Sequence, residues 1–397
     1  MSLRAQPPVR SPLTLGAIAA GIRAAAGGGA TQRAAGIQAI TERYAASAVA
    51  LTDSGTTALA LAFRLAAALR PGRPVLLPAW GCYDLATAAD SADLPVAFYD
   101  IDPGTLGPAW QSLERALGLE PAAAVAAHFY GVPVDWRRFA RLTSSAGAVP
   151  IEDAAQGAGG SASGRPLGGF GDLVVLSFGR GKGMTGGKGG ALLAHGTAWA
   201  SAVESLSLHA RWGGIRDAVV LAAQWLLTRP SLYGLPAGLP WLGLGQTVYH
   251  PPHPAEGLTA LAAGVLTVTM NLAPAEAAVR RRHAAILLER LARIECGRVT
   301  PPPDTQAGWL RMPVRLTGRD NLRVSADPLA RSLGIYPGYP MVLGDLPGFG
   351  RRVVAADAAI PGARELARTL VTLPTHGAMT ESDLERAVRW VGVRTED

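Results

Sequence analysis

The stretch from Leu176 to Ala194, LSFGRGKGMTGGKGGALLA, places Lys182 and Lys188 in a glycine-rich loop between two apolar runs. Glycine lets a backbone pass close to a ligand because it carries no Cβ. A lysine amine in such a loop can attack a carbonyl group as a nucleophile. The loop therefore indicates a site in which one of the two lysines reaches a ligand held close to the main chain.

Polar residues that could bind a ligand also follow three other apolar runs. The segment Ser54–Thr57 (SGTT) opens a helical pattern after AVALTD, Glu152–Gln156 (EDAAQ) follows AVPI, and Ser177 ends DLVVL. If these runs are parallel strands, their carboxyl ends meet where helix N-termini direct N–H groups at anions. Taken singly, SGTT is also an ordinary helix cap, and an aspartate capping a helix would explain Asp153 equally well.

The order of these parts matches what is needed to hold pyridoxal 5′-phosphate (PLP). A helix N-terminus with hydroxyls suits the phosphate, a lysine can bond to the carbonyl carbon, and an aspartate keeps the pyridine nitrogen protonated. Two adjacent acids at the end of a buried strand are costly unless one meets a cation or a protonated ring nitrogen. The sequence therefore predicts a PLP site with Asp153 and Lys182 at its centre.

Short apolar runs alternate with helical patterns from residue 49 onward, which favours a mostly parallel central sheet with helices on both faces. DLVVLSF and GGALLA lie close enough in sequence to pair directly. We expect a helical segment at 1–48, a large PLP-binding domain at 49–214, an insertion or lid at 215–255, and a long helix with a small C-terminal α+β domain at 256–397. GWLRMPVRL, RVVAAD and LVTLPTH are predicted elements of that smaller lobe.

Composition suits a globular enzyme with a large core, since the 397 residues are 49% hydrophobic and 17% charged. The net charge is +7, but the arginines are scattered along helical patterns, so no nucleic-acid partner is expected. Cys82 and Cys296 can build neither a disulfide framework nor a metal cluster, so we expect no metal and a reducing, cytoplasmic location. Arg23 interrupts the N-terminal apolar run, which argues against a signal peptide.

The segment 215–254 is rich in proline and tryptophan and interrupts the alternation of strands and helices. Its apolar part, 218–245, is broken by Arg229 and three prolines, so no continuous apolar stretch in it reaches the ~20 residues that a membrane span needs. An amphipathic insertion or lid is the favoured interpretation. A lipid-facing surface, giving peripheral membrane contact through 218–245, is the alternative.

The chain resembles the DegT/DnrJ/EryC1/StrS aminotransferases, a family of fold type I PLP-dependent enzymes best known for nucleotide-sugar aminotransferases. The matching motifs run in order from about Leu51 to Ala194: SGTTAL, VLLPAWGCYD, FYDIDPGTL, AHFYGVPVD, PIEDAAQGAG and GRPLGGFGDLVVLSFGRGKGMTGGKGGALL. The resemblance resumes weakly in LPTHGAMTESDLE. It implies the type I fold, PLP as cofactor, and a homodimer whose sites lie at the subunit interface.

The resemblance also implies roles for the central residues. Lys182 matches the Schiff-base lysine, Asp153 the partner of the pyridine nitrogen, and Gln156 the residue beside the ring hydroxyl. Lys188 falls where relatives carry Glu or Gly, so it either sits on the turn or helps to bind an anionic substrate.

Phosphate contacts in the family match Gly55, Thr56 and Ser177. The family also places an aromatic residue over the ring, in the segment that corresponds to AWGCYD. An ungapped match gives Cys82, with the aromatic residues Trp80 and Tyr83 nearby, and Tyr83 is taken as the expected stacking residue. Two histidines, His128 in AHFYG and His376 in LPTH, are either core residues or substrate contacts.

Two departures from the family pattern leave the substrate class open. The usual SFxxTKN is here SFGRGKG, so glycine rather than asparagine follows Lys182, and GxNxRM has no clear match where the insertion lies. The predicted function is transfer of an amino group from an amino acid, by resemblance glutamate, to a keto or aldehyde group of a nucleotide- or lipid-linked sugar-type acceptor. Other PLP chemistry, as a lyase or in carbon–carbon bond formation, is one alternative. A non-catalytic binding or regulatory protein is the other, and Lys182 and Asp153 count against it.

Overall fold

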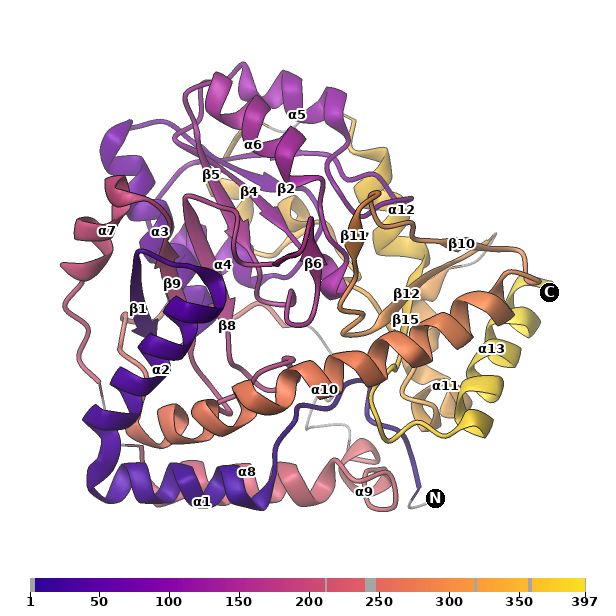
Figure 1. The fold of residues 1–397 in the computed structure, drawn as a ribbon. Helices are drawn as coiled ribbons and strands as arrows, with labels where there is room; N and C mark the ends of the chain where they lie inside the picture. The colour runs from indigo at the N-terminus through magenta and orange to yellow at the C-terminus, as the bar shows by residue number, and fades with distance from the viewer. Residues whose placement is uncertain (1–3, 211–212, 240–247, 318–319, 356–358, 397) are drawn as a thin grey trace.

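The computed structural model describes residues 4–210, 213–239, 248–317, 320–355 and 359–396 of the chain. A large α/β lobe, a long helix α10 (Ala260–Leu291) and a smaller lobe built from C-terminal elements make up the fold (Figure 1). Helix α10 runs along one side of the large lobe and reaches the smaller lobe, where α13 (Glu381–Glu396) lies beside it.

An eight-stranded sheet forms the centre of the large lobe, in the order β1-β9-β8-β5-β4-β2-β3-β14. Of the described strands of this sheet, β9 alone runs opposite to the others, so the predicted mostly parallel sheet is confirmed. The predicted direct pairing of DLVVLSF with GGALLA is also confirmed, as the β8–β9 pair. The strand bounds are β1 Ala48–Thr52, β2 Val75–Pro78, β3 Val96–Tyr99, β4 Ala123–Ala127, β5 Val149–Asp153, β8 Leu173–Ser177, β9 Gly190–Ala194 and β14 Val353–Ala355.

Alternate residues of the central strands belong to two different apolar clusters. On β8, Leu173 and Val175 join the cluster that includes α3 (Gly55–Leu69), whereas Val174 and Leu176 join the cluster formed with α2 (Gly29–Tyr44) and α10. Successive side chains of a strand point to opposite faces, so both faces of the sheet are covered, as predicted. Helices α4 (Asp84–Ser91), α5 (Trp110–Leu117) and α6 (Trp136–Ser145) add to the first cluster.

Helix α10 is apolar around its first turns because it packs on two sides. Ala262 and Leu266 face the sheet-side cluster, while Leu261 and Val265 pack with α1 (Leu15–Arg23) and α8 (Ile215–Leu227). Among the described helices, α10 alone is long and apolar enough to span a membrane by length and composition, a test that a soluble core helix also passes. Its packing against both layers is that of a core helix.

Pro274 lies inside α10, where a proline removes a backbone N–H donor from the helix. The carbonyl left without that donor belongs to Met270, four residues earlier. Arg43, in the last turn of α2, donates from Nη1 to the Met270 oxygen at 3.3 Å. The Arg43 side chain of α2 therefore replaces the missing main-chain donor.

The smaller lobe is built on a four-stranded antiparallel sheet, in the order β10-β12-β15-β13. Its elements are β10 Cys296–Arg298, β12 Met312–Leu316, β13 Tyr336–Pro337, β15 Leu370–Leu373, α11 Pro328–Ser332, α12 Pro361–Thr369 and α13. A third, three-stranded sheet joins β11 (Thr305–Gln306) to β6 (Ser161–Ala162) and β7 (Arg165–Pro166). The predicted C-terminal α+β unit is thus present.

One predicted element of the smaller lobe belongs elsewhere. RVVAAD contains β14, which extends the large central sheet by pairing in parallel with β3, with Val353 opposite Val96. The expectation that it belongs to the smaller lobe is therefore wrong. The segment is too short for its apolar pattern to specify a partner strand.

The insertion contains α8 and α9 (Gly234–Ala237), and residues 240–247 of it lie outside the described part of the chain. Leu221 of α8 is buried against α1 and α10, whereas Ile215, Val219 and Val220 are apolar and exposed, so the solvent-facing side of α8 is not the polar face of an ordinary amphipathic helix. Helix α7 (Thr197–Glu204) precedes this region. The division of the chain at residues 48, 214 and 255 and the membrane contact through 218–245 stay predictions.

Replacing Arg43 by methionine should lower the free energy of unfolding by about 1 kcal/mol, because the Met270 carbonyl loses its donor. In a Pro274→Ala background the same change should cost little, since the alanine N–H can bond that carbonyl. Urea titrations of the two single variants and the double variant measure this coupling. Equal losses from Arg43→Met in both backgrounds would contradict the compensation.

Candidate active site

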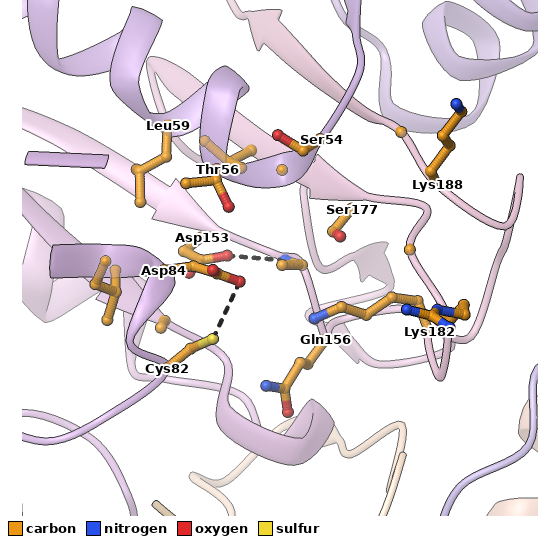
Figure 2. Close-up of a pocket in the computed structure, with 18 of the residues that line it drawn as sticks. Ser54, Thr56, Leu59, Cys82, Asp84, Asp153, Gln156, Ser177, Lys182 and Lys188 are labelled. Carbon is orange, nitrogen blue, oxygen red and sulfur yellow. Dashed lines mark hydrogen bonds between the residues drawn. The ribbon is translucent and has the colours of Figure 1, made fainter. Parts of the chain in front are cut away.

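A cavity of about 310 Å³ lies beyond the carboxyl ends of β5 and β8, at the N-terminus of α3. Most of the residues singled out from the sequence line it: Gly55, Thr56, His128, Asp153, Gln156, Ser177, Lys182 and Lys188. Figure 2 shows the Lys182 side chain extending between Ser177 and Gln156 toward Asp153. Tyr83 and His376 are not among the lining residues.

The N-terminus of α3 forms one wall of the cavity. Ser54 is the N-cap, and its Oγ accepts the N–H of Thr57 at 3.0 Å, which fixes the first turn. A Cβ on Gly55 would lie 2.8 Å from the Cβ of Ser177, so only glycine allows the helix start to approach β8 this closely. The result is a narrow cradle of main chain and hydroxyl groups at the positive end of a helix dipole, which suits a phosphate.

Asp153 closes the opposite wall and enters the cavity from the end of β5. One of its oxygens, Oδ1, accepts the N–H of Ala155 at 3.0 Å. Burial raises the pKa of this carboxyl, and the Ala155 N–H and the charge of Lys182 act in the opposite direction. A buried carboxylate of this kind is stabilised by a positively charged ligand group, such as a protonated ring nitrogen.

Glu152, the neighbouring acid, points to the other face of β5 and is fully buried. It accepts hydrogen bonds from the N–H groups of Gly168, Phe170 and Gly171 and from His128 Nε2, the last at 2.9 Å. Burial by itself raises the pKa of Glu152, but the hydrogen bonds outweigh it and hold the pKa below the ordinary value of 4.5. Glu152 is therefore satisfied within the protein, whereas Asp153 faces the cavity.

His128 is held on both ring nitrogens. Its Nδ1 accepts the N–H of Val134 at 3.1 Å, and its Nε2 donates to Glu152. The residue is 1% exposed although part of it lines the cavity. The sequence left open whether His128 is a core residue or a substrate contact. Because both ring nitrogens are bonded within the protein, the structure favours the core residue.

The loop that carries Lys182 is shaped by the N-terminal segment. Ser11 Oγ accepts the N–H of Gly181 at 3.0 Å, and a Cβ on Gly181 would lie 2.8 Å from a methyl group of Val9. Gly181 also has a φ of 77°, in the left-handed region that favours glycine. Loop and segment together direct Lys182 into the cavity.

Lys188 extends away from Lys182 in Figure 2 and forms an ion pair with Asp217 of α8 at 2.8 Å. Both side chains are partly exposed, so the pair adds little stability, but it ties the loop to the insertion. The Lys182 side chain, in contrast, extends into the cavity toward Asp153.

Gln156 is fixed from both ends of its amide. Its Oε1 accepts the N–H of Tyr130 at 2.8 Å, and its Nε2 donates to Tyr339 Oη at 2.7 Å. Tyr339 belongs to the smaller lobe and stacks on Tyr130 with ring centroids 5.9 Å apart. The contact joins the two lobes at the edge of the cavity.

Cys82, the residue of the ungapped family match, lines the cavity, whereas Tyr83, the expected stacking residue, does not. Tyr83 lies outside the cavity, and its Oη accepts the N–H of Met341 at 3.1 Å. Cys82 lines the cavity with its Sγ 3.4 Å from Asp84 Oδ2, and burial raises the pKa of its thiol. The cavity wall beside Asp153 is thus formed by Cys82, Asp84 and the apolar side chains of Leu59 and Leu85.

His376 is buried, and its Nε2 donates to the carbonyl of Pro7 at 2.8 Å. Burial lowers its pKa to about 4, so it is neutral at physiological pH. It anchors the N-terminal segment and does not reach the cavity.

Several residues of the site were missed from the sequence. Glu152 stands beside the predicted Asp153, and its backbone N–H donors, Gly168, Phe170 and Gly171, lie in the glycine-rich segment GRPLGGFGD. Asp84 is the last residue of the segment AWGCYD, so its place in that motif could have identified it. Tyr339 carried no local signal, because it reaches Gln156 from 183 residues away.

The protein has the features of a fold type I PLP-dependent enzyme: a mostly parallel sheet, a lysine in a glycine-rich loop and an aspartate that faces it. The chain belongs to the DegT/DnrJ/EryC1/StrS aminotransferase family, whose model matches residues 38–227 and 246–391. The family resemblance and the prediction of an aminotransferase are confirmed.

The chain is 27% identical over 346 residues to dTDP-4-dehydro-2,3,6-trideoxy-D-glucose 4-aminotransferase of Saccharopolyspora spinosa, which covers 85% of this chain and 81% of the relative. Sugar aminotransferase CalS13 from Micromonospora echinospora has a TM-score of 0.72 at 19% identity, covering 98% of this chain and 99% of the other. A PLP-form structure from Streptococcus pneumoniae has a TM-score of 0.76 at 15% identity, with 99% and 98% covered. The structural matches confirm the predicted fold class.

Replacing Glu152 by glutamine should lower the free energy of unfolding at pH 7 by about 3 kcal/mol, because an amide donor would face backbone N–H groups. The pKa of Glu152 is lowered in the folded protein, so its contribution is present above the unfolded value and is lost as pH falls through the folded pKa. The difference between the two proteins should therefore shrink in acid. Urea titrations at pH 7 and pH 4 measure it, with the exposed Glu120→Gln as control. A difference that stays constant with pH would contradict the role of the charge.

Proposed function

We propose that this protein is a PLP-dependent aminotransferase that moves an amino group from glutamate to the keto or aldehyde group of a sugar-type acceptor. The observation that carries the proposal is the placement of Lys182 and Asp153 in one cavity, of which the N-terminus of α3 forms another wall. Family membership supports the reaction type, and the names of the relatives support a sugar as acceptor.

The residues present fit PLP. The cradle at Gly55 and Ser177, which a Cβ on the glycine would fill, suits a phosphate, and the buried Asp153 carboxylate suits a protonated ring nitrogen. Gln156 is oriented by Tyr130 and Tyr339 beside this space. Thr56 supplies a further hydroxyl at the helix start.

When bound, PLP supplies an electron sink that eases loss of a proton from the carbon bearing the substrate's amine. The chain's own residues position and move that proton. Asp153 would hold a proton on the ring nitrogen through a charge-assisted hydrogen bond, which is about twice as strong as a neutral one. Lys182 Nζ would hold PLP and would also be the amine that accepts the proton from the carbon bearing the substrate's amine, a positioned proton transfer worth about 10²–10⁴ in rate.

The finer parts of the proposal rest on resemblance. The acceptor is nucleotide- or lipid-linked, the first being favoured by the dTDP-sugar enzyme among the relatives. Glutamate as donor, a homodimer with sites at the subunit interface and a cytoplasmic location follow the family pattern. Other PLP chemistry on the same fold is the rival reading, and amine transfer separates the two.

Borohydride reduction of the PLP-loaded protein, followed by peptide mass mapping, should place the pyridoxyl adduct on Lys182. A Lys182→Ala variant should remain folded, lose the adduct and lose activity by at least about 10²-fold. Lys188→Ala is the matched control and should keep the adduct. An adduct on Lys188, or none at all, would show that the site is assigned incorrectly.

Incubation with glutamate labelled with ¹⁵N at its amine should transfer the label to a keto-sugar acceptor, with release of 2-oxoglutarate in equal amount. Asp153→Asn should slow this transfer by about 10- to 100-fold, because the neutral amide loses a charge-assisted bond. Mass spectrometry of both products measures the transfer. Consumption of substrate without labelled amine would favour lyase or carbon–carbon chemistry instead.

A further inference from the structure

A second cavity, also of about 310 Å³, adjoins the first one on the far side of Lys182. Cys82, Asp84, Gln156, Arg180 and Lys182 line both cavities. The remaining walls come from the N-terminal segment, the aromatic residues of both lobes and the end of the insertion, namely Val9, Tyr83, Tyr130, Gly181, Val248, His250, Leu310, Arg311 and Tyr339. If PLP fills the first cavity, the second cavity offers space for a substrate beside Lys182.

Arg311 lies directly before β12 and lines this second cavity with a buried positive charge. Its Nε and Nη2 atoms are buried and have no hydrogen-bond partner among the described residues. Burial lowers the pKa of the guanidinium, although it stays charged at neutral pH. A buried cation without an anion is costly, so the fold maintains this arrangement against its own stability.

The side chains that surround Arg311 do not neutralise it. Its electrostatic neighbours are Tyr130, Tyr233, Tyr336 and Tyr339, and burial raises the pKa of each of these phenols. All four are therefore uncharged at neutral pH. The carboxylate in the cavity wall is that of Asp84, which bonds the Cys82 thiol.

Tyr130 supplies a second, independent sign of a missing ligand. Its side chain is 2% exposed, and its Oη has no hydrogen-bond partner among the described residues. Tyr130 and Trp309 both have left-handed backbone angles, with φ of 56° and 44°. The two segments are joined by the bond from Leu310 N to the Tyr130 carbonyl at 2.8 Å. Strained backbone of this kind is kept where it positions functional groups.

We propose that Arg311 and Tyr130 bind the carboxylate of the amino donor next to Lys182. A guanidinium presents two parallel N–H groups that match the two oxygens of a carboxylate, and a phenol hydroxyl adds a third donor. The ligand would satisfy both unpartnered groups and neutralise the buried cation. This inference deepens the proposed function and rests on it, because it assigns to the donor the cavity that opens onto Lys182.

Calorimetric titration of the PLP-loaded protein with glutarate tests the assignment. Glutarate keeps the two carboxylates of glutamate but has no amine, so it binds without reacting. Arg311→Met should raise its Kd by about 10- to 100-fold, as expected for loss of a charge-assisted hydrogen-bonded pair. Tyr130→Phe, which removes only the hydroxyl, should raise it by about 3- to 10-fold.

The melting temperature distinguishes binding from a structural role. Because Arg311 is a buried charge without a partner, Arg311→Met should leave the melting temperature of the ligand-free protein unchanged or raise it. Arg315→Met, four residues along β12, is the matched control: Arg315 pairs with Glu365 and lies outside the cavity. It should leave the Kd for glutarate as it is.

The proposal is overturned if Arg311→Met binds glutarate as tightly as the unaltered protein, if the unaltered protein does not bind glutarate, or if only the rate with the keto-sugar acceptor falls. The last outcome would assign Arg311 to an anionic group of the acceptor. Failure of the proposed function has a different signature, since glutarate would still bind in an Arg311-dependent way while no ¹⁵N label moved from glutamate to the acceptor.

Discussion

The buried carboxylate of Glu152 is the interaction on which the geometry of the site depends. It gathers three backbone N–H groups and His128 behind the end of β5, so the glycine-rich turn before β8 and the segment after β4 are fixed relative to each other. Because successive residues of a strand alternate in direction, holding Glu152 on one face places Asp153 on the other, in the cavity. His128 adds a main-chain bond to the Asp153 carbonyl at 3.0 Å. The fully hydrogen-bonded carboxylate of Glu152 thus orients that of Asp153, which keeps room for a ligand.

Much of the large lobe could be predicted from the sequence because its information is local. Apolar runs of strand length separated by helical patterns specify parallel strands covered on both faces, and β8 confirms this by sending alternate residues to different clusters. Asp153 and Ser54–Thr57 were also recognisable because they lie at the ends of such runs, and Lys182 because it lies in the glycine-rich loop that follows one. Parallel strands bring these carboxyl ends together.

The remainder depended on contacts between distant segments, which leave no periodic signal. Strand β14 joins β3 although more than 250 residues separate them, and Cys82 rather than Tyr83 faces the cavity because Tyr83 bonds to the main chain of Met341. Arg311 reads in sequence as an ordinary arginine at the start of a strand. Only the fold shows that tyrosines from both lobes surround it without neutralising it.

The N-terminal segment before α1 connects the parts that must stay in register for Lys182 to work. Ala5 bonds to Pro230 in the insertion, Gln6 to Ser332 and Asp383 in the smaller lobe, Pro7 to His376, and Ser11 to Gly181 in the lysine loop. Val9 of the same segment lines the second cavity. A shift of the smaller lobe would therefore also move this segment, and with it the Lys182 loop and the wall of the second cavity. Arg311 and Tyr339 enter the cavity from that lobe, so the segment couples the position of Lys182 to the position of the groups that face it.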